Sequence, residues 1–146
     1  MVLVKWSSRT VNVEIIGIDE TIRRLNAVSQ QIKTRTDVEM ARLANFVQQE
    51  AQESIVGNRG LPTTVNTGLF ASSINIRKDS DMNYLVYPEE KSYPDSPVTT
   101  AEIATFFEYG TSKVDRRPHF GDTKERTQQI VIDAIKKIIQ TTINDF

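Results

Sequence analysis

Hydrophobic and polar positions recur along this chain with two periods, one typical of strands and one typical of helices. In the run Val11–Ile15, apolar residues alternate with polar ones, which predicts a half-buried strand. Asp19 then provides a helix-capping side chain, and the apolar positions after it are spaced by three or four residues. These positions are Ile22, Leu25, Val28 and Ile32. The spacing predicts a helix with one apolar face.

A second helix signal follows the first without a break in the chain. Thr36 and Glu39 have the spacing of a capping box, which marks the start of a helix. The apolar positions after it are Met40, Leu43, Ala44, Val47, Ala51 and Ile55. No glycine or proline separates the two segments, so one long helix with a polar middle is the alternative. The capping box favours two helices with a break at Thr36.

The middle of the chain predicts a β-hairpin between two irregular segments. Apolar and polar residues alternate over 74–77, a polar tip spans 78–83, and a second apolar run covers Tyr84–Tyr87. Residues 56–68 and 88–98 have no hydrophobic period and are rich in glycine or proline. We therefore expect two long loops, which in compact domains are commonly functional.

A short helix with clear start and end signals is predicted after the second loop. Thr99 and Glu102 form another capping box, and Gly110 suits a helix end that requires positive φ. A basic turn leads from there to Pro118. We assign Gly68, Gly110 and Pro118 to structural turns.

The last helix is predicted to begin at Asp122, with Glu125 three residues on. Its apolar residues come as doublets four residues apart, namely Ile130–Val131, Ala134–Ile135, Ile138–Ile139 and Thr142–Ile143. Four residues turn about 400° in an α-helix, so the apolar stripe drifts by about 40° at each step. Such a wide, slanted stripe suits a helix lying across a twisted sheet or between two neighbours. Because β-branched residues are poor intrinsic helix formers, packing must hold this helix.

These elements predict an α+β fold in a single domain spanning 1–146. We expect a small antiparallel sheet packed against two helices of the N-terminal half and a long C-terminal helix. A chain of 146 residues can bury a core without covalent staples. The absence of cysteine excludes disulfides, thiolate zinc sites and cysteine nucleophiles. No apolar run approaches the ~20 residues of a membrane span, and the start of the chain lacks an export signal, so we expect neither insertion nor export.

Candidate catalytic residues are sparse. His119 is the only histidine, and its position between a proline and a phenylalanine favours a packing role. The acidic pairs Asp79/Asp81 and Glu89/Glu90 lie in polar turns, where solvated carboxylates are the rule. A metal-dependent hydrolase using these acids is the alternative. With no phosphate-binding or dinucleotide motif, we expect no enzyme activity and no catalytic, metal-binding or cofactor-binding residues.

Basic residues offer a second candidate site. Lys113, Arg116 and Arg117 form a local patch beside aromatic residues. Arginine pairs bidentately with carboxylates and therefore suits subunit interfaces. A small DNA-binding protein that uses the same patch on phosphates is the alternative. The formal net charge of -1 favours the interface interpretation.

Several short motifs stand in a distinctive order. Thr67–Ile74 reads TGLFASSI, Ala104 precedes the run FEYGT at Phe107–Thr111, and Arg117–Phe120 reads RPHF. With this order and spacing over residues 36–145, the chain resembles the gene-product-ten-like family of head–tail joining and tail-completion (neck) proteins of long-tailed bacteriophages. The segment Pro88–Pro97 departs from the family pattern, in which a shorter run leads to the alanine.

The resemblance implies a structural virion protein that forms a ring at the head–tail junction and joins the capsid connector to the tail. Its implied partners are copies of itself, in a hexamer in preference to a dodecamer, together with connector or portal-side proteins and tail-tube or tail-terminator proteins. DNA would pass through the ring without sequence-specific binding. The implied location is the virion neck, with assembly in the host cytoplasm. A minor capsid protein or a tail terminator of the same virion is the alternative.

Within that ring, we assign residues 56–68 and 89–98 to contacts with neighbouring rings or with the lumen. The residues assigned to the subunit or ring interface are Glu89, Glu90, Glu108, Thr111, Lys113, Arg116 and Arg117.

Overall fold

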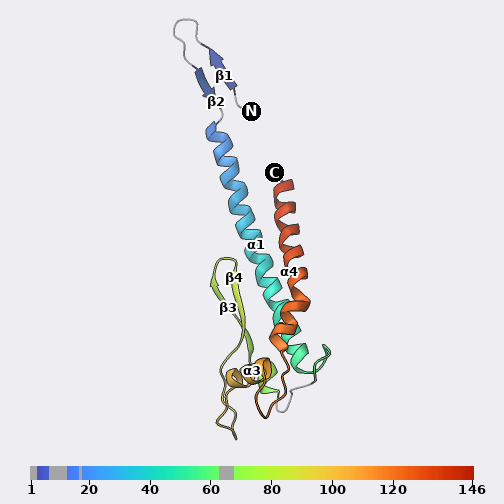
Figure 1. The fold of residues 1–146 in the computed structure, drawn as a ribbon. Coiled ribbons are helices and arrows are strands. Elements are labelled where there is room, and N and C mark those ends of the chain that lie inside the picture. The colour runs from blue at the N-terminus through green and yellow to red at the C-terminus, as the bar shows by residue number, and fades with distance from the viewer. Residues whose placement is uncertain (1–2, 7–12, 17, 63–67) are drawn as a thin grey trace.

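Two long antiparallel helices form the axis of the molecule, and a β-hairpin and two shorter helices gather around one end of it (Figure 1). The computed structural model describes residues 3–6, 13–16, 18–62 and 68–146, with side chains from residue 19 onward in these ranges. The elements in chain order are β1 (Leu3–Trp6), β2 (Val13–Ile16), α1 (Ile18–Ile55), α2 (Leu69–Ser72), β3 (Ile74–Ser80), β4 (Asn83–Pro88), α3 (Thr100–Tyr109) and α4 (His119–Asn144). The predicted α+β class with an antiparallel sheet is confirmed.

The two N-terminal strands pair with each other beside the start of α1 (Figure 1). Leu3 lies opposite Ile16 and Trp6 opposite Val13 in an antiparallel register. β2 agrees with the predicted strand, although the part of that prediction at Val11 lies outside the described residues. The alternation identified β2 but left its partner β1 unassigned.

The predicted break at Thr36 is wrong, because α1 runs without interruption from Ile18 to Ile55. A capping box starts a helix only where its first residue has left helical geometry, and here the preceding turns are helical. Thr36 is instead buried, and its hydroxyl has no hydrogen-bond partner among the described residues. Glu39 accepts from the Arg42 Nε at 3.1 Å rather than from the backbone of Thr36.

The helices α1 and α4 overlap along only part of α1. At one end, His119 meets Ser54, and at the other the guanidinium of Arg35 pairs with Asp145 at 2.5 Å. The 26 residues of α4 cover about 39 Å, which from Ser54 reaches back to about residue 28 of α1. Residues 18–27 of α1 therefore continue past the end of α4, as a projecting part about 15 Å long (Figure 1).

The core lies at the opposite end, where α2, α3 and the ends of both long helices meet β3. Its buried residues are Ala51, Ile55, Phe70, Ile74 and Ala104, with Phe107 and Phe120 packed against them. The phenyl rings of Phe70 and Phe107 stack with their centroids 6.2 Å apart.

The predicted hairpin is present as β3 and β4, and it lies against α1. Ile74 stands opposite Pro88, and the register shifts between Lys78 and Ser80. Asp37 of α1 secures the hairpin tip, because its carboxylate accepts from the Lys78 ammonium at 2.6 Å and the Met82 amide at 2.8 Å. Side-chain-to-backbone bonds from α1 hold the base of β3, and the irregular segment after β4 agrees with the predicted second loop.

Candidate interaction surface

The turn between α3 and α4 is built by Glu108. Its carboxylate accepts from the backbone amides of Phe120 at 3.1 Å and Gly121 at 2.8 Å, which are unpaired donors of the first turn of α4. This cap explains why α4 begins at His119 and not at the predicted Asp122. Asp122 lies one turn inside the helix, where it pairs with Arg126 at 2.9 Å.

The remaining residues of this turn tie it to α3. Gly110 ends α3 with φ of 75°, as predicted, but its ψ of 164° is extended rather than left-handed helical. The backbone amide of Arg117 donates to the Phe107 carbonyl at 2.7 Å, and the Arg116 Nε donates to the Glu108 carbonyl at 2.9 Å. The hydroxyl of Thr111 accepts from the Val114 amide at 3.0 Å.

His119 is buried beneath the turn, with 1% of its surface exposed. Its Nδ1 lies 2.9 Å from the Ser54 hydroxyl, and the rings of Phe70 and Phe107 meet it edge-on. Burial, reinforced by the nearby Arg117 charge, lowers the pKa of His119 to about 4. At neutral pH the imidazole is therefore uncharged, and its contacts are those of a packing residue.

An ion-pair network holds the start of α4 against the end of α1. Glu50 of α1 accepts from Arg59 at 2.8 Å and from Arg126 of α4 at 2.6 Å. Hydrogen bonds from Arg59, followed by those from Arg126, lower the pKa of Glu50 to about 2 in spite of its partial burial. The carboxylate therefore stays ionised throughout the ordinary pH range.

Some of the residues assigned to a subunit interface meet in this corner and others do not. Glu108, Thr111, Arg116 and Arg117 shape the corner, and the Arg117 guanidinium lies 5.5 Å from the centroid of the Phe107 ring. Lys113 is exposed in the same turn. The other two assigned residues, Glu89 and Glu90, lie in the loop after β4. Their assignment to an interface stays a prediction.

The side chains of α4 are distributed in an unexpected way. Its fully buried residues after His119 are threonines, namely Thr123, Thr127 and Thr142. The Thr127 and Thr142 hydroxyls donate to carbonyls one turn back in the same helix, at 2.8 and 2.7 Å, which leaves their methyl groups to pack. Several large apolar side chains of α4 are exposed instead. We call one row the α4 flank: it comprises Ile132 and Ile143, which are exposed, the half-buried Ile139 between them, and the exposed Phe146 just beyond the helix end.

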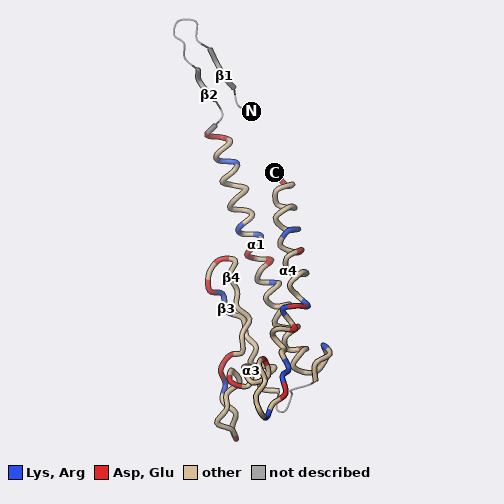
Figure 2. The backbone as a smooth tube through the Cα atoms, viewed as in Figure 1, with Lys and Arg blue, Asp and Glu red and all other residues tan. Residues whose placement is uncertain are grey.

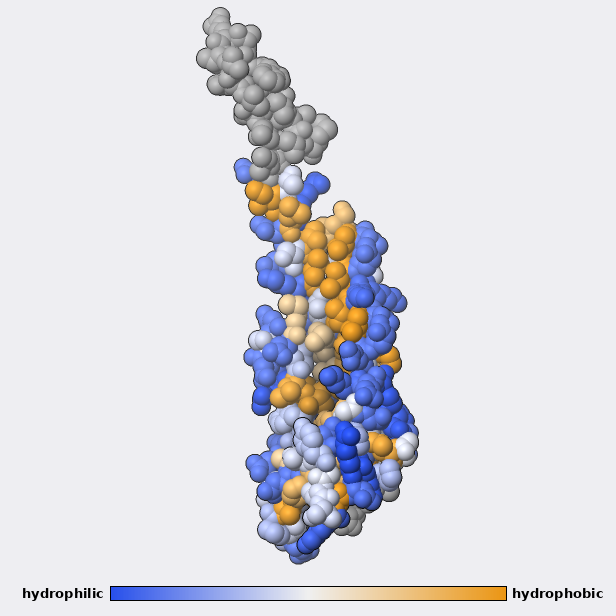
Figure 3. Space-filling model, viewed as in Figure 1, coloured by the Kyte–Doolittle hydropathy of each residue, from blue (hydrophilic) through white to orange (hydrophobic). Residues whose placement is uncertain are grey.

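The projecting part of α1 also exposes apolar side chains. The α1 stripe consists of Ile22, Leu25, Val28 and Ile32, the same positions that the periodicity identified; Ile22 and Leu25 are exposed, whereas Val28 and Ile32 are half-buried. Leu25 is 64% exposed and Ile22 49%, compared with 48% for Ile143 and 58% for Phe146 on the α4 flank. In Figure 3 hydrophobic residues form a band over neighbouring parts of the two helices, on the half of the molecule away from the core.

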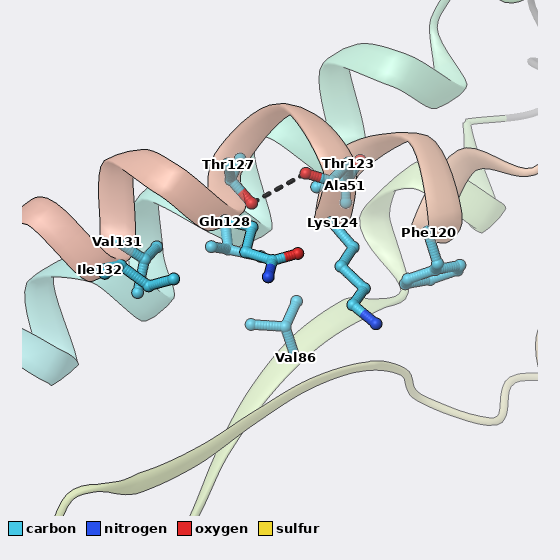
Figure 4. Close-up of a pocket in the computed structure, with 10 residues that line it drawn as sticks. Ala51, Val86, Phe120, Thr123, Lys124, Thr127, Gln128, Val131 and Ile132 are labelled. Atoms are coloured by element: carbon cyan, nitrogen blue, oxygen red, sulfur yellow. Dashed lines mark hydrogen bonds between the residues drawn. The ribbon is translucent and has the colours of Figure 1, made fainter.

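A groove continues this apolar surface toward the hairpin. It has a volume of about 330 Å³ and lies between α4 and Val86 of β4, with Ala51 of α1 behind them (Figure 4). Ile132 belongs both to the groove and to the α4 flank, so the two are adjacent. Lys124 and Gln128 border the groove with their polar ends.

The charged residues that the structure describes do not form a single extended patch. Lysines and arginines alternate with acids along both long helices (Figure 2). Among the described residues, no group of three or more histidine, cysteine or acidic side chains is placed to hold a metal ion. No helix in the described part of the chain is both long and apolar enough to cross a membrane.

The apolar spacing in the sequence identifies the α1 stripe but does not indicate that part of it is exposed. The period of three and four residues is the same whether a neighbouring element covers the face or leaves it open, so only the length of α4 reveals the difference.

No protein-family model, curated protein or solved structure matches this chain. The resemblance to phage neck proteins therefore depends on the sequence motifs and on where they lie in the fold.

Proposed function

We propose that this chain is a structural virion protein of a tailed bacteriophage, which forms a ring at the head–tail junction and joins the capsid connector to the tail. The observation that carries the proposal is the exposure of two apolar helix surfaces, the α1 stripe and the α4 flank, on a chain whose core occupies one end. Contiguous exposed apolar surface of this kind marks a protein–protein interface.

The placement of the family motifs supports the proposal. The two most specific motifs, Phe107–Thr111 and Arg117–Phe120, contact each other through the Phe107–Arg117 backbone bond and through the Glu108 cap. They therefore act as one structural unit, which sets the direction of α4. Two short motifs that contact each other in the fold are stronger support for a family resemblance than two motifs that lie apart.

The chemistry of the chain is consistent with a structural role. The buried histidine is held in a packing contact, and the arginines of the turn make contacts within the chain. Ring assembly requires complementary surfaces on each subunit, and in this proposal the two apolar surfaces serve as them. In this proposal the ring is a hexamer whose neighbours are connector or portal-side proteins and tail-tube or tail-terminator proteins, and DNA passes through its centre.

A nonsense mutation in the phage gene tests this function. We expect lysates with separate DNA-filled heads and complete tails, visible by negative-stain electron microscopy, because the junction between them is missing. Supplying the intact chain from a plasmid should restore joined particles and excludes an effect on downstream genes. Immunogold labelling should then mark the neck of those particles.

Other results would assign a different role. Label on the capsid shell with normal tails attached in its absence would indicate a minor capsid protein. Tails of abnormal length in the mutant would indicate a tail terminator. Normal infectious particles in the mutant would overturn any structural role in the virion.

A further inference from the structure

The hairpin β3–β4 is attached to the rest of the molecule most firmly at its base. Ile74, the first residue of β3, belongs to the core, and its carbonyl accepts from the Gln48 side chain at 2.8 Å. The backbone amide of Glu89, just after β4, donates to the Ser73 carbonyl at 2.8 Å. Toward the tip burial ends, and residues 77–83 are all exposed. The base is therefore fixed, whereas the outer half of the hairpin has little apolar contact to hold it.

The face of α1 beneath the hairpin is lined by small side chains between two polar ones. Asp37, Ala41, Ala44 and Gln48 follow one another at intervals of four, three and four residues, which places them on one face of the helix. Asp37 and Gln48 both bond to the hairpin, so this is the face that the hairpin crosses. The two residues between them are alanines, which offer one methyl group each. Hydrophobic burial along this crossing is therefore small.

The carboxylate of Asp37 fastens the tip to α1. It accepts from the Lys78 ammonium at 2.6 Å, from the Met82 amide at 2.8 Å and from the Tyr84 hydroxyl at 3.2 Å. Within the described part of the chain, no other side chain of α1 forms a hydrogen bond or ion pair with residues 77–84. The bond from Lys78, followed by that from the Met82 amide, lowers the pKa of Asp37, so the carboxylate is ionised at neutral pH.

The surroundings of this carboxylate are not closely packed. A hollow of about 270 Å³ adjoins Asp37, bordered by Asp81 of the tip and by residues 30–38 of α1. Met82 has a φ of 58°, which residues other than glycine rarely adopt, and in this conformation its amide reaches Asp37. A segment with few buried contacts, secured by polar bonds at one point, opens locally at a low free-energy cost.

The hairpin is also one wall of the groove beside α4. Val86 of β4 lies across the groove from α4, with Ala51 of α1 behind both (Figure 4). Val86 is two residues from Tyr84, which bonds to Asp37, so the position of this wall depends on where the tip lies. Movement of the tip away from α1 would draw Val86 outward and widen the groove.

We propose that the β3–β4 hairpin is a hinged arm that Asp37 holds closed. Its hinge is the base at Ile74, and its tip leaves α1 when the three bonds to the Asp37 carboxylate break. The open arm frees Lys78 and Tyr84 and widens the groove at the end lined by Ile132. This device goes beyond the proposed ring and operates in a single copy of the chain.

Hydrogen exchange followed by mass spectrometry tests the contact at Asp37. Asp37→Ala removes all three bonds, and exchange of the amides of residues 76–86 should accelerate by about tenfold or more, because bonds to a charged group are strong. Asp37→Asn keeps an oxygen for the Met82 amide but loses the negative charge, so its increase should be smaller. Asp79→Asn is the matched control: Asp79 pairs with Arg77 of its own strand, and its loss should leave the exchange unchanged.

Movement of the arm is measured by double electron–electron resonance between two spin labels, because the natural chain contains no cysteine. Leu85→Cys places one label at an exposed position of β4, and Glu125→Cys places the other at an exposed position of α4. With Asp37 present, the labels should give one narrow distribution of distances. Asp37→Ala should add a population at longer distance, and Asp79→Asn should not.

Three results would overturn the hinged arm. Equal exchange in Asp37→Ala and Asp79→Asn would show that other contacts hold the tip. Faster exchange throughout the core, at Ile55 and Ile74 as well as in the hairpin, would show that Asp37 supports the whole fold. Faster exchange in the hairpin with an unchanged distance between the labels would show that the strands fray in place and do not move as an arm.

Discussion

At the end of the molecule where α4 begins, side chains from α1, α2, β3, α3 and α4 bury one another, whereas at the other end α1 continues alone. The first end contains the core and the closely bonded turn around Glu108 and His119. The second end contains the α1 stripe, in which Leu25 keeps 64% of its surface exposed. Both ends carry apolar residues at helical spacing, so the difference lies in what covers them.

The two ends of α1 use hydrophobic side chains in different ways. Within α1, Ile55 completes a core that the chain buries by itself, and Leu25 has the same chemistry without a neighbour. Burial of an aliphatic side chain stabilises the folded state by about 1.5–3 kcal/mol. The exposed residues of the stripe gain this stabilisation only when a partner covers them. The core end should therefore govern folding, and the projecting end should govern association.

The largest expected effect is at the core. Ile55→Ala should lower the free energy of unfolding by about 2–5 kcal/mol, because Ile55 is fully buried and its removal leaves a cavity beside Phe70 and Ile74. Urea denaturation at a protein concentration that keeps the chain monomeric measures this change. A loss below about 1 kcal/mol would mean that the corner is not the folding core.

The next effect is a dependence of stability on pH that comes from His119. Its pKa is about 4 in the folded chain, compared with the usual 6.5, so between these values the unfolded chain binds a proton that the folded chain does not. Stability should therefore fall as pH drops from 6.5 to 4, by about 3 kcal/mol in total. Denaturation curves at pH 7, 6 and 5 measure the slope above the range in which most carboxylates titrate.

His119→Gln is the control for this pH effect. Because the chain has a single histidine, the variant should be less stable at neutral pH but should lose most of the slope between pH 6.5 and 5. The same slope in both proteins would assign the effect to other groups.

Strain in the turn between α3 and α4 gives a smaller change in the free energy of unfolding. Gly110→Val should lower it by about 2–3 kcal/mol, because the φ of 75° disfavours a branched side chain and a Cβ there would lie 3.3 Å from the Cβ of Arg116. Gly60→Val is the comparison variant: its φ of 89° is also positive, but a Cβ there meets nothing within 4 Å. Thermal unfolding should show the larger loss for Gly110, and equal losses would mean that the turn tolerates crowding.

The smallest effect on folding is expected at the α1 stripe. Leu25→Ala should change the unfolding free energy of the monomer by no more than about 0.5 kcal/mol, because its side chain is largely exposed. The measurement is urea denaturation of the dilute protein beside Ile55→Ala. A loss as large as that of Ile55 would show that the stripe is covered within the monomer, and the contrast between the two ends would be lost.

Local signals in the sequence were sufficient for several elements. The capping box at Thr99 is present with both of its hydrogen bonds, Gly110 adopts positive φ, and the alternation over 74–77 forms β3. These features depend on residues close together in the chain, whose preferences act before distant parts meet. The same kind of signal failed at Thr36, because a helix already formed by its N-terminal neighbours overrides a start signal inside it.

The start of α4 shows what local signals omit. Asp122 had the pattern of a helix start, but the amides of Phe120 and Gly121 are capped by Glu108 from another helix. Twelve residues separate Glu108 from Phe120, and no period or motif relates a carboxylate to a helix start at that distance. The pairing of His119 with Ser54 is likewise formed only when α1 and α4 lie side by side.

The sequence by itself determined the helical spacing of apolar residues in α1 and α4, the hairpin, and the turn residues between α3 and α4. Only the tertiary structure decided which apolar faces are buried, because α4 ends before it reaches the first turns of α1, which begins at Ile18. Periodicity defines a face, but burial depends on whether another element reaches it. For Ile22 and Leu25 no element of the described chain does so, and the apolar face that the sequence predicted there stays exposed.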